Sequence, residues 1–188
     1  MPKMVDKAAR REQILDAAAK VFARKGFAAS RIEDVAAAAG IAKGSVYLYF
    51  GSRDELLTGV FDSYAARSAE TLADLGDGHA LDQLERLVRG TVELLAAHPD
   101  HARVLLDVWA NPPLDMTAMY RDYRAIIAEL LTRARAEGAL RAGIDSAHAA
   151  VIVGAIEGCL IQTLLDPELD LNDLATPLVQ LCVEGIRG

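Results

Sequence analysis

One short stretch of this sequence places a cation, a hydroxyl and a phenol close together. Residues 42–50 read AKGSVYLYF. In a helix, Val46 and Phe50 share one face and can continue an apolar core. The opposite face carries Lys43, Gly44, Tyr47 and Leu48, with Ser45 beside them. A helix of this kind can press its polar face against a charged, grooved surface.

The chemistry of that face suits double-stranded DNA. Lys43 and Ser45 can reach base edges or phosphates, and Gly44 has no side chain to hold the helix away. Tyr47 can donate a hydrogen bond to a phosphate oxygen while its ring packs on sugar. We expect Arg53, in the first turn of the next helix, to pair with the DNA backbone, helped by the amides at that helix N-terminus.

The elements around this stretch can position it. Ser30-Arg31-Ile32-Glu33 is a capping-box pattern, which predicts a helix start, and Gly40 ends that helix after about two turns. A third helix is expected from about 42 to 49, and a second capping box at 52–55 opens the next helix. A helix, a tight turn and a second short helix form a helix-turn-helix.

The rest of the chain reads as amphipathic helices. Of its 188 residues, 52% are hydrophobic but only 5% aromatic, and β-branched alternation is scarce. We therefore predict an all-α fold of about nine helices, the last two over about 146–165 and 171–186. The N-terminus lacks an apolar segment, so we expect no secretory signal and a cytoplasmic protein. Cys159 and Cys182 form no disulfide framework, which fits a reducing compartment.

Charge is divided unevenly along the chain. The net charge is −7, but residues 1–53 hold ten Lys/Arg against five Asp/Glu, a balance of +5. Residues 54–188 hold ten against twenty-two, a balance of −12. The N-terminal third therefore favours nucleic acid as a partner, although the whole-chain charge argues against it.

The same region resembles a known family. Ordered motifs run from Phe22 through Lys25-Gly26-Phe27, Ala39-Gly40 and Lys43-Gly44-Ser45-Val46-Tyr47-x-Tyr49-Phe50 to Arg53-x-x-Leu56-Leu57. They are similar to the DNA-binding domain of the TetR/AcrR transcriptional regulators. Arg53 departs mildly from the family, which more often has lysine there.

The resemblance implies a homodimer that binds operator DNA. Residues 1–52 would form the helix-turn-helix domain, and residues 53–188 the effector-binding and dimerisation domain. The implied DNA contacts are Ser30, Arg31, Lys43, Gly44, Ser45, Tyr47, Leu48, Tyr49 and Arg53. For Tyr49, core packing remains an equal alternative to DNA contact.

Two further groups of residues suggest a dimer seam and a ligand site. Ala150, Gly154 and Gly158 recur every four residues and permit close helix packing between two subunits, or within one. The last helix would complete the seam with Leu174, Leu178 and Leu181. A pocket for an apolar ligand, or ordinary core, is suggested by Trp109, Met116, Met119, Tyr120 and Tyr123. Glu157 and Gln162 could line that pocket or lie at the dimer edge.

These patterns favour a regulator over an enzyme. No nucleophile–base pair or phosphate-binding glycine loop is evident, and we expect no cofactor and no metal, since His98 and His101 lack further ligands nearby. The leading hypothesis is a repressor that binds a near-palindromic operator as a homodimer and is released by a small apolar or cationic effector. The alternative is a DNA-binding dimer controlled by a protein partner, or without an effector.

Overall fold

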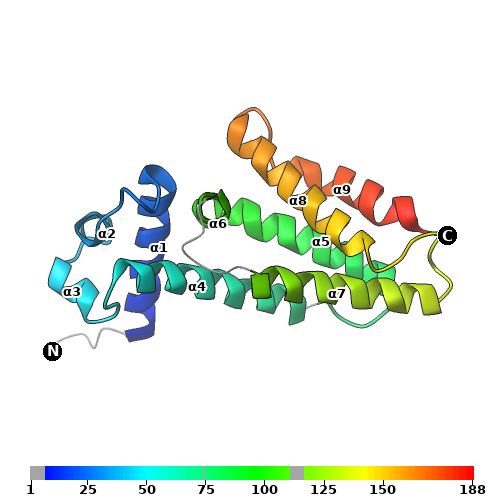
Figure 1. Cartoon of the computed structure of the whole chain (residues 1–188), viewed down its shortest axis with the longest axis horizontal. Coiled ribbons are helices and arrows are strands. Elements are labelled where there is room, and N and C mark those ends of the chain that lie inside the picture. Colours follow the sequence, from blue (N-terminus) through cyan, green and yellow to red (C-terminus); the bar gives the residue numbers. More distant parts are fainter. Residues whose placement is uncertain (1–6, 74, 111–116) are drawn as a thin grey trace. The chain divides into compact units, whose positions relative to one another are not determined.

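The computed structural model describes residues 7–73, 75–110 and 117–188 (Figure 1). Within these ranges the chain forms nine α-helices, two 3-10 turns and one isolated β-bridge, between Leu140 and Arg187. The helices are α1 (Lys7–Lys25), α2 (Ile32–Ala38), α3 (Lys43–Tyr47), α4 (Arg53–Ala73), α5 (Ala80–Ala97), α6 (Pro99–Ala110), α7 (Thr117–Ala136), α8 (His148–Leu165) and α9 (Ala175–Cys182). The predicted all-α fold is confirmed.

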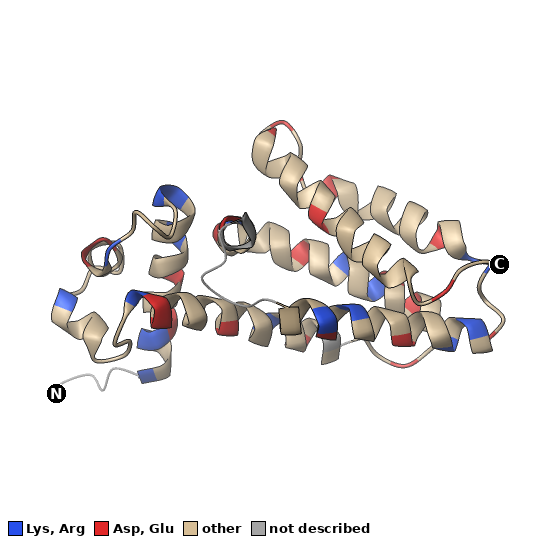
Figure 2. Ribbon diagram, in the orientation of Figure 1, with Lys and Arg blue, Asp and Glu red and all other residues tan. Residues whose placement is uncertain are grey.

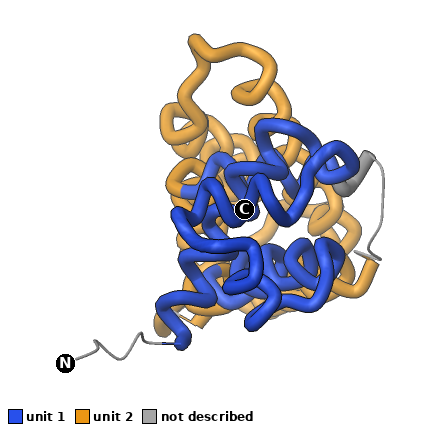
Figure 3. The backbone as a smooth tube through the Cα atoms, turned by 90° about the vertical axis from the view of Figure 1, so that its left-hand side faces the viewer, with its two compact units in different colours: residues 1–67, 98–114 blue, residues 68–97, 115–188 orange. Residues whose placement is uncertain are grey.

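The chain divides into two compact units (Figure 3). Unit 1 contains residues 1–67 and 98–114, and unit 2 contains residues 68–97 and 115–188. Helix α6 therefore belongs with the N-terminal helices, and it packs on α1. The functional boundary expected at residue 52 remains a prediction, because compactness alone does not assign function.

Unit 1 has a small core shared by its first four helices. Phe22, Val35, Val46 and Phe50 are all buried, as the helical phase of the sequence predicts. Helix α4 comes unusually close at Gly59, where a Cβ would stand 2.8 Å from the Leu15 side chain. A larger residue there would push α4 away from α1, so the glycine sets how tightly the unit closes.

The two capping boxes behave differently. The Ser52 hydroxyl accepts the backbone N–H of Glu55 at 3.0 Å, and the Glu55 carboxylate accepts the N–H of Gly51 at 2.7 Å, so α4 begins with a capped turn as predicted. The prediction that Ser30 caps α2 is wrong. Arg31 is the N-cap, and its backbone N–H donates to Asp34, while Ser30 is buried and bonds elsewhere.

Unit 2 is built around α5, which packs against α7, α8 and α9. Its apolar stripe, including Leu81, Leu84 and Val88, is fully buried. The predicted final helix over 171–186 is shorter than expected, because α9 covers only Ala175–Cys182 and is flanked by 3-10 turns at Asn172–Leu174 and Glu184–Ile186.

Candidate DNA-binding surface and effector region

Helix α3 presents the face that the sequence predicted. Val46 is fully buried beneath it, whereas Tyr47 is 47% exposed and Leu48 is 80% exposed. Gly44 is exposed, and a Cβ added there would meet no atom of residues 7–73, 75–110 or 117–188 within 4 Å. The helix is only five residues long, shorter than the predicted span of 42–49. Its outer surface is therefore narrow and open.

The turn before α3 holds this surface in place. Gly40 has a φ of +67°, a left-handed conformation that glycine adopts without steric cost. The Gln13 side chain on α1 donates to the carbonyl of Ala39 at 2.9 Å. The turn is thus tied to α1, which fixes α3 relative to the rest of unit 1.

The cation on this face is already paired. The ammonium of Lys43 lies 2.6 Å from the carboxylate of Glu33 on α2, and 5.7 Å from the centre of the Tyr47 ring. Figure 2 shows a basic (blue) segment on α3 and an acidic (red) segment on the neighbouring α2. The hydrogen bond to Glu33 raises the pKa of Lys43, and the same bond lowers the pKa of Glu33. Lys43 is charged, but it must leave or share Glu33 before it contacts a phosphate.

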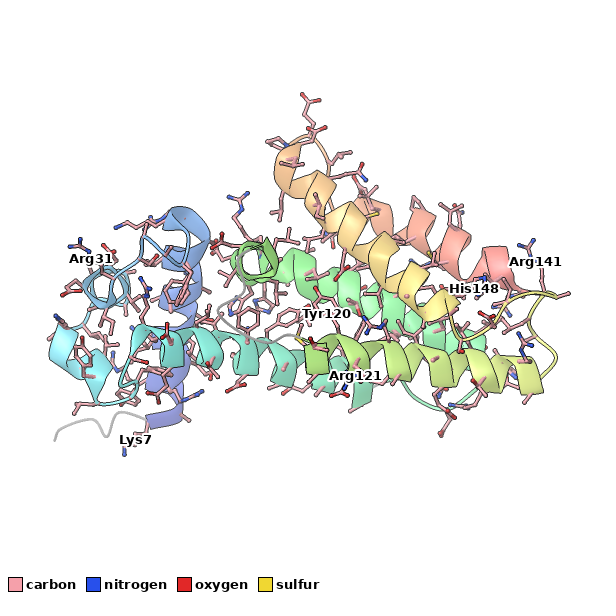
Figure 4. The ribbon with its side chains drawn as sticks, in the orientation of Figure 1. Lys7, Arg31, Tyr120, Arg121, Arg141 and His148 are labelled. Carbon is pink, nitrogen blue, oxygen red and sulfur yellow. The ribbon has the colours of Figure 1, made fainter. Side chains whose placement is uncertain are left out.

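The expected contacts near the start of α2 are not equally accessible. Arg31 is exposed and labelled in Figure 4, where its side chain projects from unit 1. Ser30 is 1% exposed, and its hydroxyl donates to the carbonyl of Gly26 at 2.7 Å. Ser45 and Tyr49 are half-buried, so Tyr49 retains both of its predicted roles.

Arg53 makes contacts within the protein that the sequence did not reveal. Its Nη1 donates to the carbonyls of Ala28 at 3.0 Å and Ser30 at 2.8 Å, and its guanidinium lies 4.4 Å from the centre of the Phe27 ring. The backbone N–H of Phe27 in turn donates to Asp107 on α6 at 3.0 Å. Arg53 therefore clamps the loop between α1 and α2, in addition to any contact with DNA.

A second polar cluster inside unit 1 was also missed. Arg67 on α4 lies 3.4 Å from Asp16 and 3.7 Å from Glu12 on α1, and it donates to the His98 ring at 3.1 Å. His101 packs on His98 and is 5% exposed, and its Nε2 has no hydrogen-bond partner among the described residues. Burial lowers the pKa of both histidines, and the charge of Arg67 adds to this effect.

Part of the expected ligand cluster comes together in unit 2. Tyr120 on α7 (Figure 4) hydrogen-bonds with Glu157 on α8; burial, and then this bond, raise the pKa of Tyr120. Burial raises the pKa of Tyr123 to about 12, and its hydroxyl bonds to Thr91 on α5. Met119, on the same helix, is half-buried.

The remaining ligand candidates are not gathered in the same way. Gln162 is exposed near the end of α8. Met116 and the side chain of Trp109 lie outside the described residues. The structure thus brings together Tyr120, Glu157 and Tyr123 from the predicted set.

Helix α8 carries an apolar stripe that no other described part of the chain covers. By length and composition alone it is apolar enough to cross a membrane, with a mean hydropathy of 1.6. Only 28% of it is buried in the protomer, so most of its apolar surface is accessible. Every third or fourth residue of one face is small or apolar and accessible: Val151, Gly154, Gly158, Ile161 and Leu165. A Cβ at either glycine would meet no atom of the described residues within 4 Å, so packing against those residues does not require a glycine at either position.

The other expected seam residues are mixed. Ala150 is exposed beside this stripe, and Leu181 on α9 is 76% exposed. Leu174 is half-buried, and Leu178 is buried inside unit 2, where it offers little surface to a partner. The seven-residue rhythm from 151 to 165 was visible in the sequence, although only its glycines were singled out.

A helix-turn-helix with an open recognition helix, carried on a larger helical body, defines a DNA-binding transcriptional regulator. The family described as bacterial regulatory proteins, tetR family, matches residues 14–60. The repressor KstR2 of Rhodococcus jostii is 31% identical over 148 residues, which cover 74% of this chain and 72% of that protein. The chain belongs to the TetR family.

Two further comparisons extend over nearly the whole chain. The fatty acid metabolism regulator protein of Bacillus subtilis is 27% identical over 184 residues, 94% of this chain and 95% of that protein. The crystal structure of the regulator FadR from Bacillus subtilis in complex with stearoyl-CoA has a TM-score of 0.80 at 26% identity, and covers 93% of this chain and 98% of that one. The relatives are named as regulators, and this chain is a transcriptional regulator and not an enzyme.

Proposed function

We propose that this protein is a cytoplasmic, ligand-responsive repressor that binds a near-palindromic operator as a homodimer. The observation that carries the proposal is the outer face of α3, where Lys43, Gly44 and Tyr47 are exposed above a fully buried Val46. Two such helices in a dimer can enter successive major grooves about 34–36 Å apart. Arg31 and Arg53 flank this face and supply further cations for phosphates.

The dimer is proposed to form through α8 and α9. Burying the stripe from Val151 to Leu165, together with Leu181, would remove large exposed side chains from water. The two glycines would let the partner helix approach closely. The seam then centres on α8, because Leu178 on α9 is already buried in its own protomer.

The effector is proposed to contact unit 2 near Tyr120, Tyr123 and Glu157. Three helices meet there, and the two phenols are held by hydrogen bonds to Glu157 and Thr91. Met119 and the tyrosine rings suit an apolar body, and the Glu157 carboxylate suits a cation or a hydrogen-bond donor. Long-chain acyl-CoAs and steroids are the first compounds to test. One similar structure is a complex of FadR with stearoyl-CoA, and another is of a ketosteroid transcriptional regulator.

DNA binding is tested by titrating the full-length protein against DNA from just upstream of its own coding region. We expect tight, salt-sensitive binding that Tyr47→Ala weakens. The affinity of Tyr47→Phe should lie between those of the wild type and Tyr47→Ala, because this variant keeps the ring and loses the hydroxyl. The control is Arg103→Ala, which removes an exposed cation on α6, outside the helix-turn-helix. Equal loss with Arg103→Ala and Tyr47→Ala would argue against α3 as the reading element.

Effector binding is tested by thermal shift with acyl-CoAs, steroids and cationic amphiphiles. A ligand that binds only the folded state increases the free energy of unfolding by about 2.7 kcal/mol when its concentration is a hundred times its Kd. The melting temperature rises accordingly. We expect the active compound to lose this effect in Tyr120→Phe or Glu157→Gln. If no compound shifts the wild-type protein, control by a protein partner, or without an effector, becomes the better hypothesis.

A further inference from the structure

The acidic residues at the start of α2 lie beside the proposed DNA-binding face. Glu33 and Asp34 occupy the first turn of α2, and each pairs with a lysine at 2.6 Å, Glu33 with Lys43 and Asp34 with Lys25. Acidic residues are favourable in the first turn of a helix, but a carboxylate beside a phosphate-binding face also repels the phosphate. The two carboxylates differ in what else they do.

Asp34 has a clear structural role. It accepts the backbone N–H of Arg31 at 3.1 Å, which satisfies a donor at the start of α2. Glu33 instead reaches across to α3, and its side chain is 56% exposed. Its partner is the first residue of the recognition helix, whose own side chain is 49% exposed.

An exposed ion pair of this kind adds little to the stability of the fold, because water and salt screen the attraction between the two charges. We expect the pair to affect DNA binding more than it affects the stability of the fold. A phosphate that approaches Lys43 competes with the Glu33 carboxylate for the same ammonium, and the carboxylate left behind repels the phosphate. The pair therefore opposes DNA binding while hardly supporting the fold.

We propose that Glu33 is an affinity-limiting residue of the DNA-binding surface, which holds the Lys43 ammonium and so weakens binding to DNA of any sequence. The inference rests on the proposed contact of α3 with DNA. Weak general binding frees the protein from the large excess of non-operator DNA and leaves base contacts to hold it at its operator.

The test uses the full-length protein with Glu33→Gln, which keeps the size of the side chain and removes its charge. The matched control is Asp62→Asn, the same charge change at an exposed site farther along α4. We expect Glu33→Gln to bind both operator and unrelated duplex DNA roughly twofold to fivefold more tightly at low salt. The slope of log affinity against log salt should steepen by up to about 0.9 for each subunit of the dimer, and Asp62→Asn should change neither the affinity nor the slope.

A double variant separates release of Lys43 from general charge removal. In the Lys43→Ala background, Glu33→Gln has no ammonium to release, so the salt slope should stay as it is in Lys43→Ala alone. Unchanged affinity and slope in the single variant would overturn the proposal. So would weaker binding confined to the operator, because Glu33 would then be accepting a hydrogen bond from a base. If the wild-type protein binds no DNA at all, the proposed function fails instead.

Discussion

Arg53 offers the sharpest test of how the fold and the DNA-binding surface share a residue. The family resemblance makes it a phosphate contact, whereas the structure makes it a clamp on the loop between α1 and α2. Its Nη1 bonds to two carbonyls, of Ala28 and Ser30, and its guanidinium stacks on Phe27. Replacement by lysine separates the two roles, because an ammonium keeps the charge but lacks the planar, forked group.

The magnitudes follow from those contacts. Each partly exposed hydrogen bond is worth about 1 kcal/mol, and the stacking about 0.5 kcal/mol. Arg53→Ala should therefore lose about 2.5 kcal/mol, which lowers the melting temperature by about 5–10 °C in a chain of this size. Arg53→Lys can keep one bond, so it should lose about half as much.

The assays are thermal melting and fluorescence anisotropy with operator DNA at two salt concentrations. We expect Arg53→Lys to melt below wild type but to keep its salt slope. Arg53→Ala should melt at the lowest temperature and flatten the slope by about 0.9 for each subunit of the dimer. Arg103→Ala on α6 serves as the control for removing an exposed cation from unit 1. A wild-type melting temperature for Arg53→Lys would refute the clamp, and an unchanged slope for Arg53→Ala would refute the phosphate contact.

Three other predictions follow from burial and packing. Burial lowers the pKa of His101, so below about pH 6.5 the unfolded chain binds a proton more readily than the folded protein does. The melting temperature should therefore fall from pH 7 to pH 5, and His101→Leu should make this fall smaller. Gly59→Ala should destabilise the protein by about 1 kcal/mol in urea unfolding, since crowding against Leu15 outweighs the gain in helix propensity; a more stable variant would contradict the close contact. Gly154→Leu should give monomers in sedimentation experiments while the helix content stays the same, because the protomer itself leaves room at that site; an intact dimer would place the seam elsewhere.

Much of the DNA-binding unit could be predicted from the sequence because its signals are local. Helical periodicity placed Val46 and Phe50 inside and Tyr47 and Leu48 outside, as the structure has them. The capping of α4 by Ser52 was also predictable, because that bond joins residues three apart. The same capping pattern at Ser30 gave a wrong prediction, because the Ser30 hydroxyl donates to the carbonyl of Gly26 instead of capping α2.

The effector region and the dimer seam were less predictable. Apolar spacing cannot distinguish a stripe buried by its own chain from one left for a partner, so Leu178 and Leu181 looked alike in the sequence. In the structure the first is buried and the second is 76% exposed. Similarly, Tyr120 and Glu157 are 37 positions apart, and only the packing of α7 on α8 brings them into contact.

By itself, the sequence determined the helices, the helix-turn-helix and the face of α3 that meets solvent, because periodicity, glycine turns and charge act over a few residues. Tertiary structure alone decided which of the predicted DNA contacts are already engaged. Lys43 is held by Glu33, ten residues away, and Arg53 is held by carbonyls more than twenty residues away. Such contacts depend on how helices meet, and no local pattern records them.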